Sequence, residues 1–487
     1  MRLTGDTPVG RRVAVVAAVG VLSGAASVLL DWRLLVPIAF GVPLALMAVL
    51  AAWPHEGDRL SLSPQPTFHG AVHDVRWVAA SLVLAATFAG VGFFDGARDA
   101  SEAASGNLSR DNLLELAAMG MGTLTVLSAL RQGWRHRVPP HAWLFVAYAG
   151  LTLASVLWSR LPLFSAARAF EFATVAGLAA YGAMRAANER GFADRLLVQV
   201  FRLLTVVVGA LAALSVAQGG LDYERFSFRG THPNTAAAMM LVVMLALAFH
   251  PQRARITRPV PWWVVVVALA PLVHATGSRV YTFAAVVALA AGGAMAGLRD
   301  KRVGALNLAV GASAVALVAH LASDQVVEFL RREQDEHGVR GLNGRLELWD
   351  WVLSNPVGSE VYGVGVGAVR GGLPVSWDPS NAHSAWIDIL QTLGVLGLGV
   401  MGALVLAVAL LALVRRSVQG TWMGVFLVVS STTSVTISQP GAPLMVLTLC
   451  VIVLALPVAD GAPHRTMTPS GARRTQPFAS GAGPVDG

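Results

Sequence analysis

Four stretches of this sequence combine an arginine or a histidine with turn-forming residues at the edge of a long apolar run. These stretches are RFSFRGTHPN (225–234), ATGSRVY (275–281), the segment 341–372, and SNAHSAWIDILQTLGVLGLG (380–399). The residues of interest in them are Arg229, Arg279, Arg345 and His383. A guanidinium stays charged and can donate two parallel hydrogen bonds to a phosphate, and an imidazole can take a proton from a hydroxyl near neutral pH. Together these residue types fit group transfer from a diphosphate leaving group to an acceptor hydroxyl.

Each of these residues also fits a purely structural role. Arg229 could lie in a polar turn and extend its charge to the membrane surface, and Arg279 could anchor a short turn at the membrane edge. Ser380 or Asn381 could cap the helix that follows, with His383 at or just before the start of that helix. Asp388 lies inside the apolar run, where an ionisable side chain is a functional candidate.

The segment 341–372 contains two further patterns. RLELWDWVL places Leu346, Trp349 and Leu353 along one side of a helix, which predicts a helix lying at the membrane surface. GVGVG (363–367) resembles a nucleotide-binding loop only superficially. We expect no strand and helix around it, and its glycine spacing differs from that of the dinucleotide-binding motif.

The composition predicts a polytopic membrane protein. Of the 487 residues, 55% are hydrophobic and only 13% are charged, whereas a soluble domain carries about twice that charged fraction. Apolar runs of about 20 residues, enough to cross a bilayer as a helix, recur along nearly the whole chain. The single cysteine, Cys450, lies inside one of these runs, so an intramolecular disulfide is excluded.

We therefore expect an all-α polytopic membrane protein with about 14 transmembrane helices and one long outer loop (322–384) that contains short interfacial helices. The predicted spans are 12–30, 34–53, 77–95, 113–130, 143–158, 166–185, 196–216, 235–250, 261–276, 280–298, 303–321, 385–414, 421–437 and 443–459. The span 385–414 is long enough to be tilted or broken at its glycines. The tail 461–487 is rich in Gly, Pro, Ser and Thr, which predicts disorder.

The distribution of positive charge predicts the orientation in the membrane. Alternate loops and both termini hold 22 of the 36 Lys and Arg residues, whereas the short loops between them hold 7 and the long loop 322–384 holds 5. Positive residues concentrate on the cytoplasmic side, so we expect both termini in the cytoplasm and all four polar stretches on the outer face. The net charge of +8 then reflects topology. We expect no nucleic-acid partner, since no compact basic domain is present.

Several of these motifs resemble the O-antigen ligase and polymerase superfamily. They are GTHPN, GSR, GRLELWDWVLSNPVGSEVYGVGVG and NAHSAWIDILQTLGVLGLG. The family pattern has an outer Arg before a Gly…Pro-Asn turn, then Ser-Arg, then Arg…Trp with a following Gly-x-Gly, and finally a His with a Gly-x-x-Gly helix. WSRLPLFSAARAFE (158–171) also resembles the segment ahead of this core. The resemblance covers roughly 143–400 and is most specific in 341–399.

The resemblance implies a GT-C-like fold and an activity. Members of the family transfer glycans from an undecaprenyl-diphosphate carrier to an acceptor hydroxyl on the outer face of the cytoplasmic membrane. The expected organisation is 1–142 as transmembrane helices of unassigned role, 143–460 as the ligase-like core, and 461–487 as a cytoplasmic tail. The expected partners are the undecaprenyl-diphosphate-linked glycan, a glycan, lipid or protein acceptor, and the bilayer.

The resemblance also implies roles for individual residues. His383 matches the family's histidine and is expected to deprotonate, or hydrogen-bond, the acceptor hydroxyl. Ser384 follows it where the family usually has Asn. The residues expected to hold the diphosphate and stabilise its charge are Arg229, Arg279 and Arg345. Supporting roles are expected for Arg160, Asn234, Asn381 and Asp388.

No metal or other cofactor is expected, because arginines would stabilise the leaving group. Many lipid-sugar transferases bind a divalent metal with paired acids near the first outer loop, but here that loop is DWR (31–33), with one acid. The other candidate ligands have a spacing that matches no known site type; they are His232, Asp335, Glu336 and His337.

Two alternative functions remain open at this level. A polymerase that extends a lipid-linked glycan would use the same residue types as a ligase that moves a finished glycan to a different acceptor. A transporter or flippase of the lipid-linked precursor would instead need polar or charged residues in the middle of its spans. Glu115 and Glu171 are the main acids within or near spans, so the sequence favours transfer over transport.

Overall fold

The computed structural model of this chain describes 75–88, 110–131, 138–189, 191–218, 225–228, 231–299, 345–355, 358–368, 384–432, 434 and 442–455. Within these ranges the secondary structure is helical, apart from one isolated bridge between Ser359 and Gly363. The predicted spans 12–30, 34–53 and 303–321 lie outside the described residues, as does the predicted tail.

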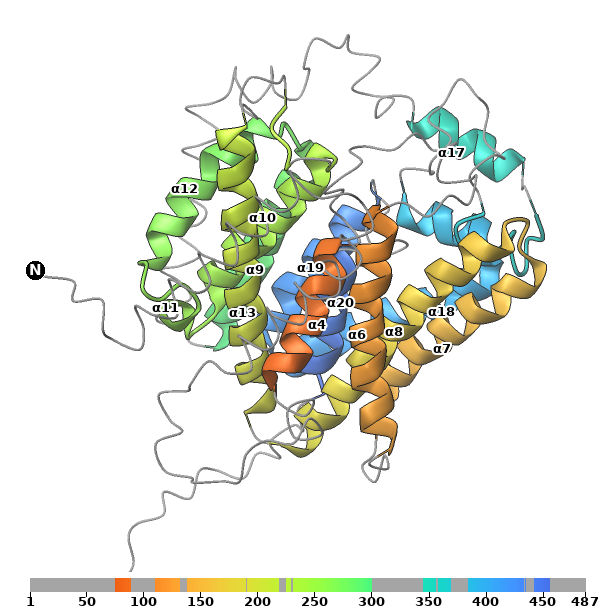
Figure 1. Ribbon diagram of the computed structural model, residues 1–487, viewed down its shortest axis with the longest axis horizontal. Helices are drawn as coiled ribbons and strands as arrows, with labels where there is room; N and C mark the ends of the chain where they lie inside the picture. The colour runs from red at the N-terminus through yellow and green to blue at the C-terminus, as the bar shows by residue number, and fades with distance from the viewer. Residues whose placement is uncertain are drawn as a thin grey trace, which may run out of the picture. The chain divides into compact units, whose positions relative to one another are not determined.

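The helices follow the apolar runs of the sequence (Figure 1). They are α4 (Val75–Phe88), α6 (Arg110–Arg131), α7 (Pro140–Ser155), η2 (Val156–Trp158), α8 (Pro162–Asn188), α9 (Phe192–Ala217), α10 (Pro233–Phe249), α11 (Arg253–Ile256), α12 (Trp262–Ala275), α13 (Arg279–Arg299), α17 (Arg345–Ser354), α18 (Ala385–Val414), α19 (Val418–Thr432) and α20 (Ala442–Val453). Prolines occupy the first turn of α7, α8 and α10, where a missing N–H costs no hydrogen bond.

Among the described residues, five helical stretches are long and apolar enough to cross a membrane. They are Pro140–Trp158, Pro162–Asn188, Phe192–Ala217, Arg279–Leu298 and Ala385–Val414. Shorter apolar helices accompany them, including α10 and α12. The expectation of an all-helical, multi-pass membrane protein is therefore confirmed at this level. The number of 14 spans and the GT-C-like arrangement stay predictions.

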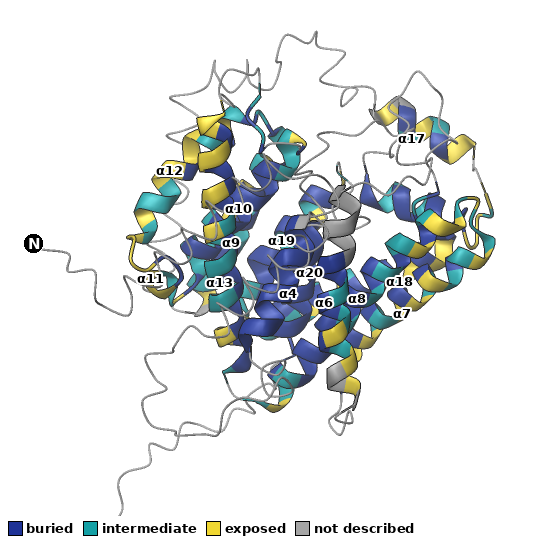
Figure 2. Ribbon diagram, in the orientation of Figure 1, coloured by how far each residue is buried: buried dark blue, intermediate teal, exposed yellow. Residues whose placement is uncertain are grey.

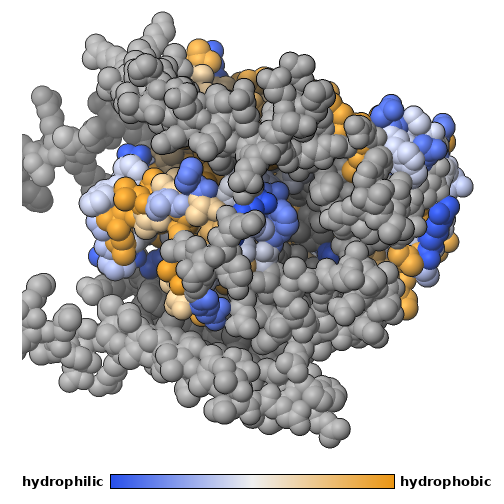
Figure 3. Space-filling view, turned by 90° about the horizontal axis from the view of Figure 1, so that it is seen from above, coloured by the Kyte–Doolittle hydropathy of each residue, from blue (hydrophilic) through white to orange (hydrophobic). Residues whose placement is uncertain are grey.

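Two groups of helices form the buried interior. α4, α6, α8 and α20 pack against one another, and α13 packs on α19, which also contacts α18 (Figure 1). α10 is buried along most of its length (Figure 2). Apolar side chains are also exposed on the outer sides of several helices, for example Trp263, Val267 and Phe283, and Figure 3 shows apolar residues at the surface beside hydrophilic ones. Exposed apolar helix faces are what lipid contact requires.

α18 is broken at Gly394. Its φ of 65° and ψ of −164° lie far from helical values and in a region open to glycine. The break frees backbone groups of α18, and 360–365 binds them: Val364 and Gly365 donate to the carbonyls of Gln391 and Thr392 (3.0 and 2.9 Å), while Val395 and Leu396 donate to those of Glu360 and Val361 (2.9 and 3.2 Å). These four bonds satisfy backbone groups of α18 that the break removes from the helical pattern, as burial in a membrane protein demands. The expectation that this span is tilted or broken is confirmed.

GVGVG is the loop that makes these contacts. Its three glycines have positive φ, and a Cβ on Gly365 would lie 2.6 Å from Cβ of Ser159. The Val366 N–H donates to Ser155 (3.1 Å), and its carbonyl accepts from the Ser165 hydroxyl (2.6 Å). The loop thus joins 158–171 to α18, so its glycines serve close packing.

α17 forms where RLELWDWVL predicts a helix. Leu348 and Val352 are buried and cluster with Val364 and Ala368 of the following loop. Leu346 and Leu353, from the side expected to face the membrane, are exposed, at 46% and 58%. The contact of α17 with a membrane surface stays a prediction.

Candidate functional site

Arg225 binds the C-terminal end of α12. Its Nε donates to the carbonyl of Thr276 (2.8 Å), and one terminal nitrogen lies 3.5 Å from the carbonyl of Gly277. The N–H of Phe226 next to it donates to the carbonyl of Ala275 (2.9 Å). The last carbonyls of a helix carry its negative dipole end, so a cation is favoured there.

The segment after Arg225 is held by its alternating aromatic residues. Phe226 and Phe228 are fully buried, with ring centroids 6.0 Å apart in an edge-to-face arrangement. Burial of two phenylalanines anchors the segment, because each removes a large apolar area from water or lipid headgroups. Arg225 is consequently fixed beside the turn that connects α12 to α13.

The guanidinium of Arg225 also reaches the start of α10. It donates to Oδ1 of Asn234 at 3.3 Å, and the N–H of Asn234 donates to Nδ1 of His232 at 3.1 Å. One side chain therefore ties the first turn of α10 to the last turn of α12. In the sequence Arg225 contributes only to the charge of an outer loop, because its acceptors at the end of α12 lie about 50 residues away along the chain.

Arg279 begins α13 directly after this tied turn. Gly277 has a φ of 58°, and the N–H of Ser278 donates to the hydroxyl of Thr276 (3.2 Å). Arg279 itself is half-buried. The Ser278 hydroxyl is only 1% exposed and makes no hydrogen bond in the part of the chain that the structure describes. The cation of Arg279 therefore follows the buried hydroxyl of Ser278 directly in the sequence.

Ser434 connects the start of α13 to the start of α18. Its hydroxyl lies 3.1 Å from the hydroxyl of Tyr281, two residues after Arg279. Its backbone carbonyl accepts from the N–H of Ala385, two residues after His383, at 3.0 Å. Two helix starts that are more than 100 residues apart are therefore neighbours through one residue. No motif in the sequence marks Ser434.

Three of the predicted site residues lie outside the described residues: Arg229, Asn381 and His383. Arg345 is the first residue of α17, and its side chain lies outside the described part. The N-cap residue of α18 is Ser384, which is buried and makes no side-chain capping bond. The helix begins at Ala385, where the predicted span 385–414 begins, and its N-cap is Ser384 and not Ser380 or Asn381.

Of the remaining predicted site residues, one is hydrogen-bonded to Arg225 and the other two lie on other elements. Asn234 is held by Arg225, as described above. Arg160 is exposed in the turn between η2 and α8. Asp388 is 7% exposed in the first turn of α18, where a carboxylate complements the positive helix end, and it interacts electrostatically with Tyr148 of α7.

Glu171 has a partner within its own helix. Its carboxylate accepts from Arg168 at 2.8 Å, and its side chain is only 4% exposed. The guanidinium of Arg168 also lies 5.4 Å from the centre of the Phe164 ring. An internally paired acid of this kind is typical of a structural ion pair, since an unpaired buried charge would be costly.

A small apolar pocket adjoins the start of α18. It is lined by Trp386 and Val405 of α18, Leu427 and Ser431 of α19, and Leu447 of α20, among others. Within the described ranges, no group of three or more His, Cys, Asp or Glu side chains is arranged to hold a metal ion. The polar side chains near the turn between α12 and α13 include Arg225, Asn234, Ser278, Arg279 and Tyr281, whose guanidinium, amide and hydroxyl groups can bind phosphate and sugar oxygens.

No protein-family model matches this chain, and no curated protein matches it. The structure is that of a helical, multi-pass membrane protein. The turn between α12 and α13, which Arg225 binds and which Arg279 follows, adjoins the start of α18 through Ser434. Any functional assignment has to come from these residues and their contacts.

Proposed function

We propose that this protein is an O-antigen ligase-like glycosyltransferase. It moves a glycan from an undecaprenyl-diphosphate carrier to an acceptor hydroxyl on the outer face of the cytoplasmic membrane. The same chemistry serves a polymerase that extends a lipid-linked glycan. The acceptor distinguishes the two enzymes, and the ligase is the assignment favoured here.

The observation that carries the proposal is the contact through Ser434. Tyr281 and Ala385, each two residues from a residue assigned to catalysis from sequence, both hydrogen-bond to this residue. A cationic turn and the entry of the histidine-bearing stretch into α18 are thereby neighbours. Group transfer needs this proximity, because base and leaving-group stabiliser must act on one substrate.

In the proposed reaction, His383 accepts the proton of the acceptor hydroxyl as its oxygen attacks the anomeric carbon of the glycan. The bond between that carbon and the diphosphate oxygen breaks, and undecaprenyl diphosphate leaves with the bonding electron pair. Arg279, with Arg229 and Arg345, stabilises the negative charge that develops on the diphosphate. Arginine suits this task because it stays protonated throughout the reaction.

The apolar side chains around Trp386 support a lipid-linked donor. Trp386 follows Ala385, and its neighbours across a small pocket are almost entirely apolar. A polar reaction site at the edge of an apolar surface suits a substrate whose diphosphate is polar and whose carrier is a hydrocarbon chain. The buried Arg168–Glu171 pair, by contrast, offers little support for a transport path through the bundle.

The test is transfer from a synthetic undecaprenyl-diphosphate glycan by the purified full-length protein in detergent. Product formation is measured by mass spectrometry with a panel of acceptors and with chelator present. Comparison of envelope glycans from cells with and without the protein identifies the acceptor. Transfer lost in His383→Ala supports the proposal. Absence of any transfer by a folded protein with every acceptor, or an absolute need for a divalent metal, would overturn it.

A further inference from the structure

Ser278 stands directly before the first residue of α13, in the position that usually caps a helix. A capping serine accepts a hydrogen bond from one of the first N–H groups of its helix. Ser417 does so at the start of α19, where its hydroxyl accepts from the N–H of Gly420 at 3.0 Å. The hydroxyl of Ser278 makes no hydrogen bond with any residue that the structure describes. The first N–H groups of α13, which have no acceptor within the helix, therefore gain none from Ser278.

Burial makes the lack of a partner for this hydroxyl unfavourable. Ser278 is 1% exposed, so water does not replace the missing partner. A buried hydroxyl without a hydrogen bond destabilises a fold, whereas a methyl group in its place is nearly neutral or stabilising. The free energy lost by burying the hydroxyl is recovered when a ligand supplies an acceptor.

The rest of Ser278 is held within the protein. Its N–H donates to the hydroxyl of Thr276 (3.2 Å), and its carbonyl accepts from both the N–H and the hydroxyl of Thr282 (3.2 and 2.7 Å). Arg225 binds the carbonyl of Thr276 from the other side. The backbone around Ser278 is thus fixed, and among the described residues its hydroxyl alone is left without a partner. Donors that are fixed in advance are those that stabilise developing charge best.

The place of the hydroxyl indicates what it can bind. In the capping position a serine hydroxyl lies beside the first N–H groups of the helix. α13 has 21 residues, and the positive end of its dipole lies at this start. The hydroxyl and the N–H groups are all able to donate, so a negatively charged group with several acceptor oxygens fits them, as a phosphate does.

An apolar surface on α13 follows this turn. Phe283 and Val286, three residues apart and so on one side of the helix, are both exposed. A hydrocarbon chain joined to the phosphate can lie along this side. The surface therefore favours a lipid-linked phosphate over a soluble one.

We propose that the hydroxyl of Ser278 and the first backbone N–H groups of α13 donate to a phosphate oxygen of the lipid-linked diphosphate. This inference rests on the proposed function, in which Arg279 stabilises the same leaving group, and it adds uncharged donors to the site. When the bond to the anomeric carbon breaks, the diphosphate keeps the bonding electrons and these donors stabilise its charge. Ser278 keeps its proton throughout and forms no covalent bond.

The experiment compares the full-length wild-type protein with Ser278→Ala. Binding of undecaprenyl diphosphate is measured by native mass spectrometry, and unfolding temperature is measured in detergent with and without that ligand. Ser278→Ala should bind undecaprenyl diphosphate about tenfold more weakly, because a hydrogen bond to a charged group is lost. Its unfolding temperature without ligand should equal or exceed that of the wild type, because no bond within the protein is lost. Inorganic pyrophosphate is the soluble probe and should bind the wild type more weakly.

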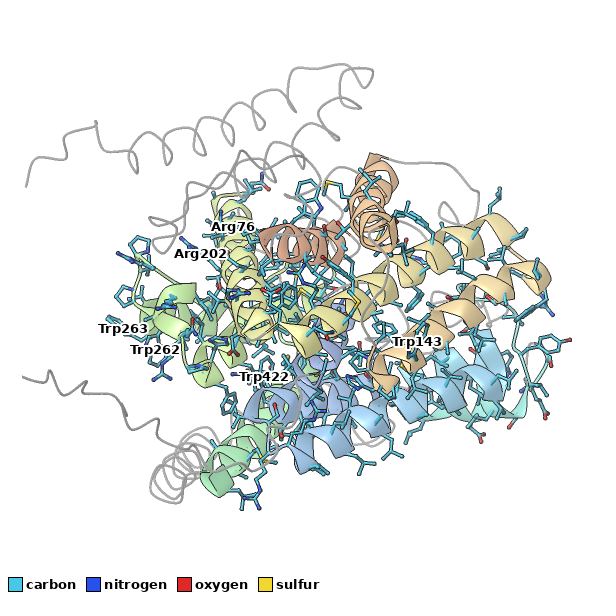
Figure 4. The ribbon with its side chains drawn as sticks, turned by 90° about the horizontal axis from the view of Figure 1, so that it is seen from below. Arg76, Trp143, Arg202, Trp262, Trp263 and Trp422 are labelled. Atoms are coloured by element: carbon cyan, nitrogen blue, oxygen red, sulfur yellow. The ribbon has the colours of Figure 1, made fainter. Side chains whose placement is uncertain are left out.

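Thr421→Val is the matched control. The hydroxyl of Thr421, in the first turn of α19, is also buried and has no hydrogen bond within the described ranges. The next residue is Trp422, which is fully buried and labelled in Figure 4; it stacks on Phe249 at the end of α10, with centroids 6.4 Å apart. Phe201, next to Arg202, also packs on Trp422, at 6.3 Å. Thr421 is therefore at the other end of α10 from the start that Arg225 binds, and its substitution should leave ligand binding unchanged.

Four outcomes would contradict the inference. Equal binding by Ser278→Ala and a wild type that transfers would overturn it and leave the proposed function standing. An equal loss of binding in Thr421→Val would also overturn it. So would a fall in the ligand-free unfolding temperature of Ser278→Ala as large as that of Ser434→Ala, since it would reveal a partner within the protein. Equal affinity of the wild type for pyrophosphate would overturn the assignment to a lipid-linked ligand. A folded wild type that binds no undecaprenyl diphosphate would instead overturn the proposed function, and this inference with it.

Discussion

The two ends of α10 use arginine in different ways. At the start of α10, the guanidinium of Arg225 donates to the end of α12 and to Asn234, all within the protein. At the other end, the half-buried Arg202 feels the charges of Arg258 and Arg76, which come from other elements. The first arrangement links a guanidinium to backbone and side-chain acceptors, whereas the second places like charges on neighbouring elements.

The polarity of α12 explains the difference. Its carbonyl end meets Arg225, and its N–H end lies near Arg258. A cation at the carbonyl end is stabilised by the helix and needs no further ligand, whereas cations at the N–H end add to a positive field. Identical side chains therefore stabilise one end of α12 and add like charge near the other.

The largest expected effect concerns the proposed transfer site and leaves the other end of α10 unaffected. His383→Ala should lower transfer by about 10²–10⁴-fold, the usual contribution of a general base, and leave binding of the lipid diphosphate nearly unchanged. Turnover is measured in detergent, and donor binding is measured by native mass spectrometry. His274→Ala, at the exposed end of α12, is the control and should retain transfer. Near-normal turnover in His383→Ala would show that His383 is not the general base, and the chemical difference between the two ends of α10 would then be lost.

The second largest effect is expected when the planar guanidinium of Arg279 is replaced by an ammonium group. Arg279→Lys keeps the charge but loses the planar fork, so transfer should fall by about 10²-fold while the protein still inserts and expresses. Arg258→Lys at the other end should leave transfer unaltered. Full activity in Arg279→Lys would reduce this residue to a membrane anchor.

A third substitution tests whether Arg225 stabilises the fold by linking the end of α12 to the start of α10. Arg225→Ala removes charge-assisted bonds to Thr276 and Asn234, which should destabilise the fold by about 1.5–3 kcal/mol. Arg225→Lys should recover only part, because an ammonium cannot span both acceptors. Thermal unfolding in detergent is the measurement. A stability loss no greater than that of the exposed Arg255→Ala would contradict the tie.

The smallest effect concerns the hydroxyl contact between Tyr281 and Ser434. Ser434→Ala and Tyr281→Phe should each cost about 0.5–1.5 kcal/mol, and the double variant should cost less than their sum because both remove the same bond. The backbone bond from Ala385 remains in both variants. Simple additivity of the two losses would show that the hydroxyls do not interact.

Within the described residues, local sequence predicted the long apolar helices and located their ends less well. The predicted 196–216 and 280–298 lie inside α9 and α13, and 235–250 differs from α10 by two residues at its start. Hydrophobic length identifies a span, while its ends depend on capping and on proline in the first turn. Pro233 begins α10 two residues before the apolar run does.

The contacts of the candidate site could not be predicted in the same way. Arg225 finds its acceptors in a different helix, and Ser434 joins residues 153 and 49 positions away, so no local pattern marks either. The glycines of 385–414 indicated a break, but its location at Gly394 depends on the docking of 360–365. Likewise, counting charges by loop predicts an orientation and cannot detect that the charges of Arg258 and Arg76 act on Arg202.

The break in α18 bears on the assembly of the protein during synthesis. The chain enters the membrane as a 30-residue apolar segment, which the insertion machinery meets as one hydrophobic unit. Its bend requires hydrogen bonds from 360–365, a part of the chain that has left the ribosome earlier. The partner for the bend is thus already made when the segment arrives, and α18 can bend without exposing its backbone to lipid. The loop 360–365 therefore forms its backbone hydrogen bonds to α18 only when α18 bends.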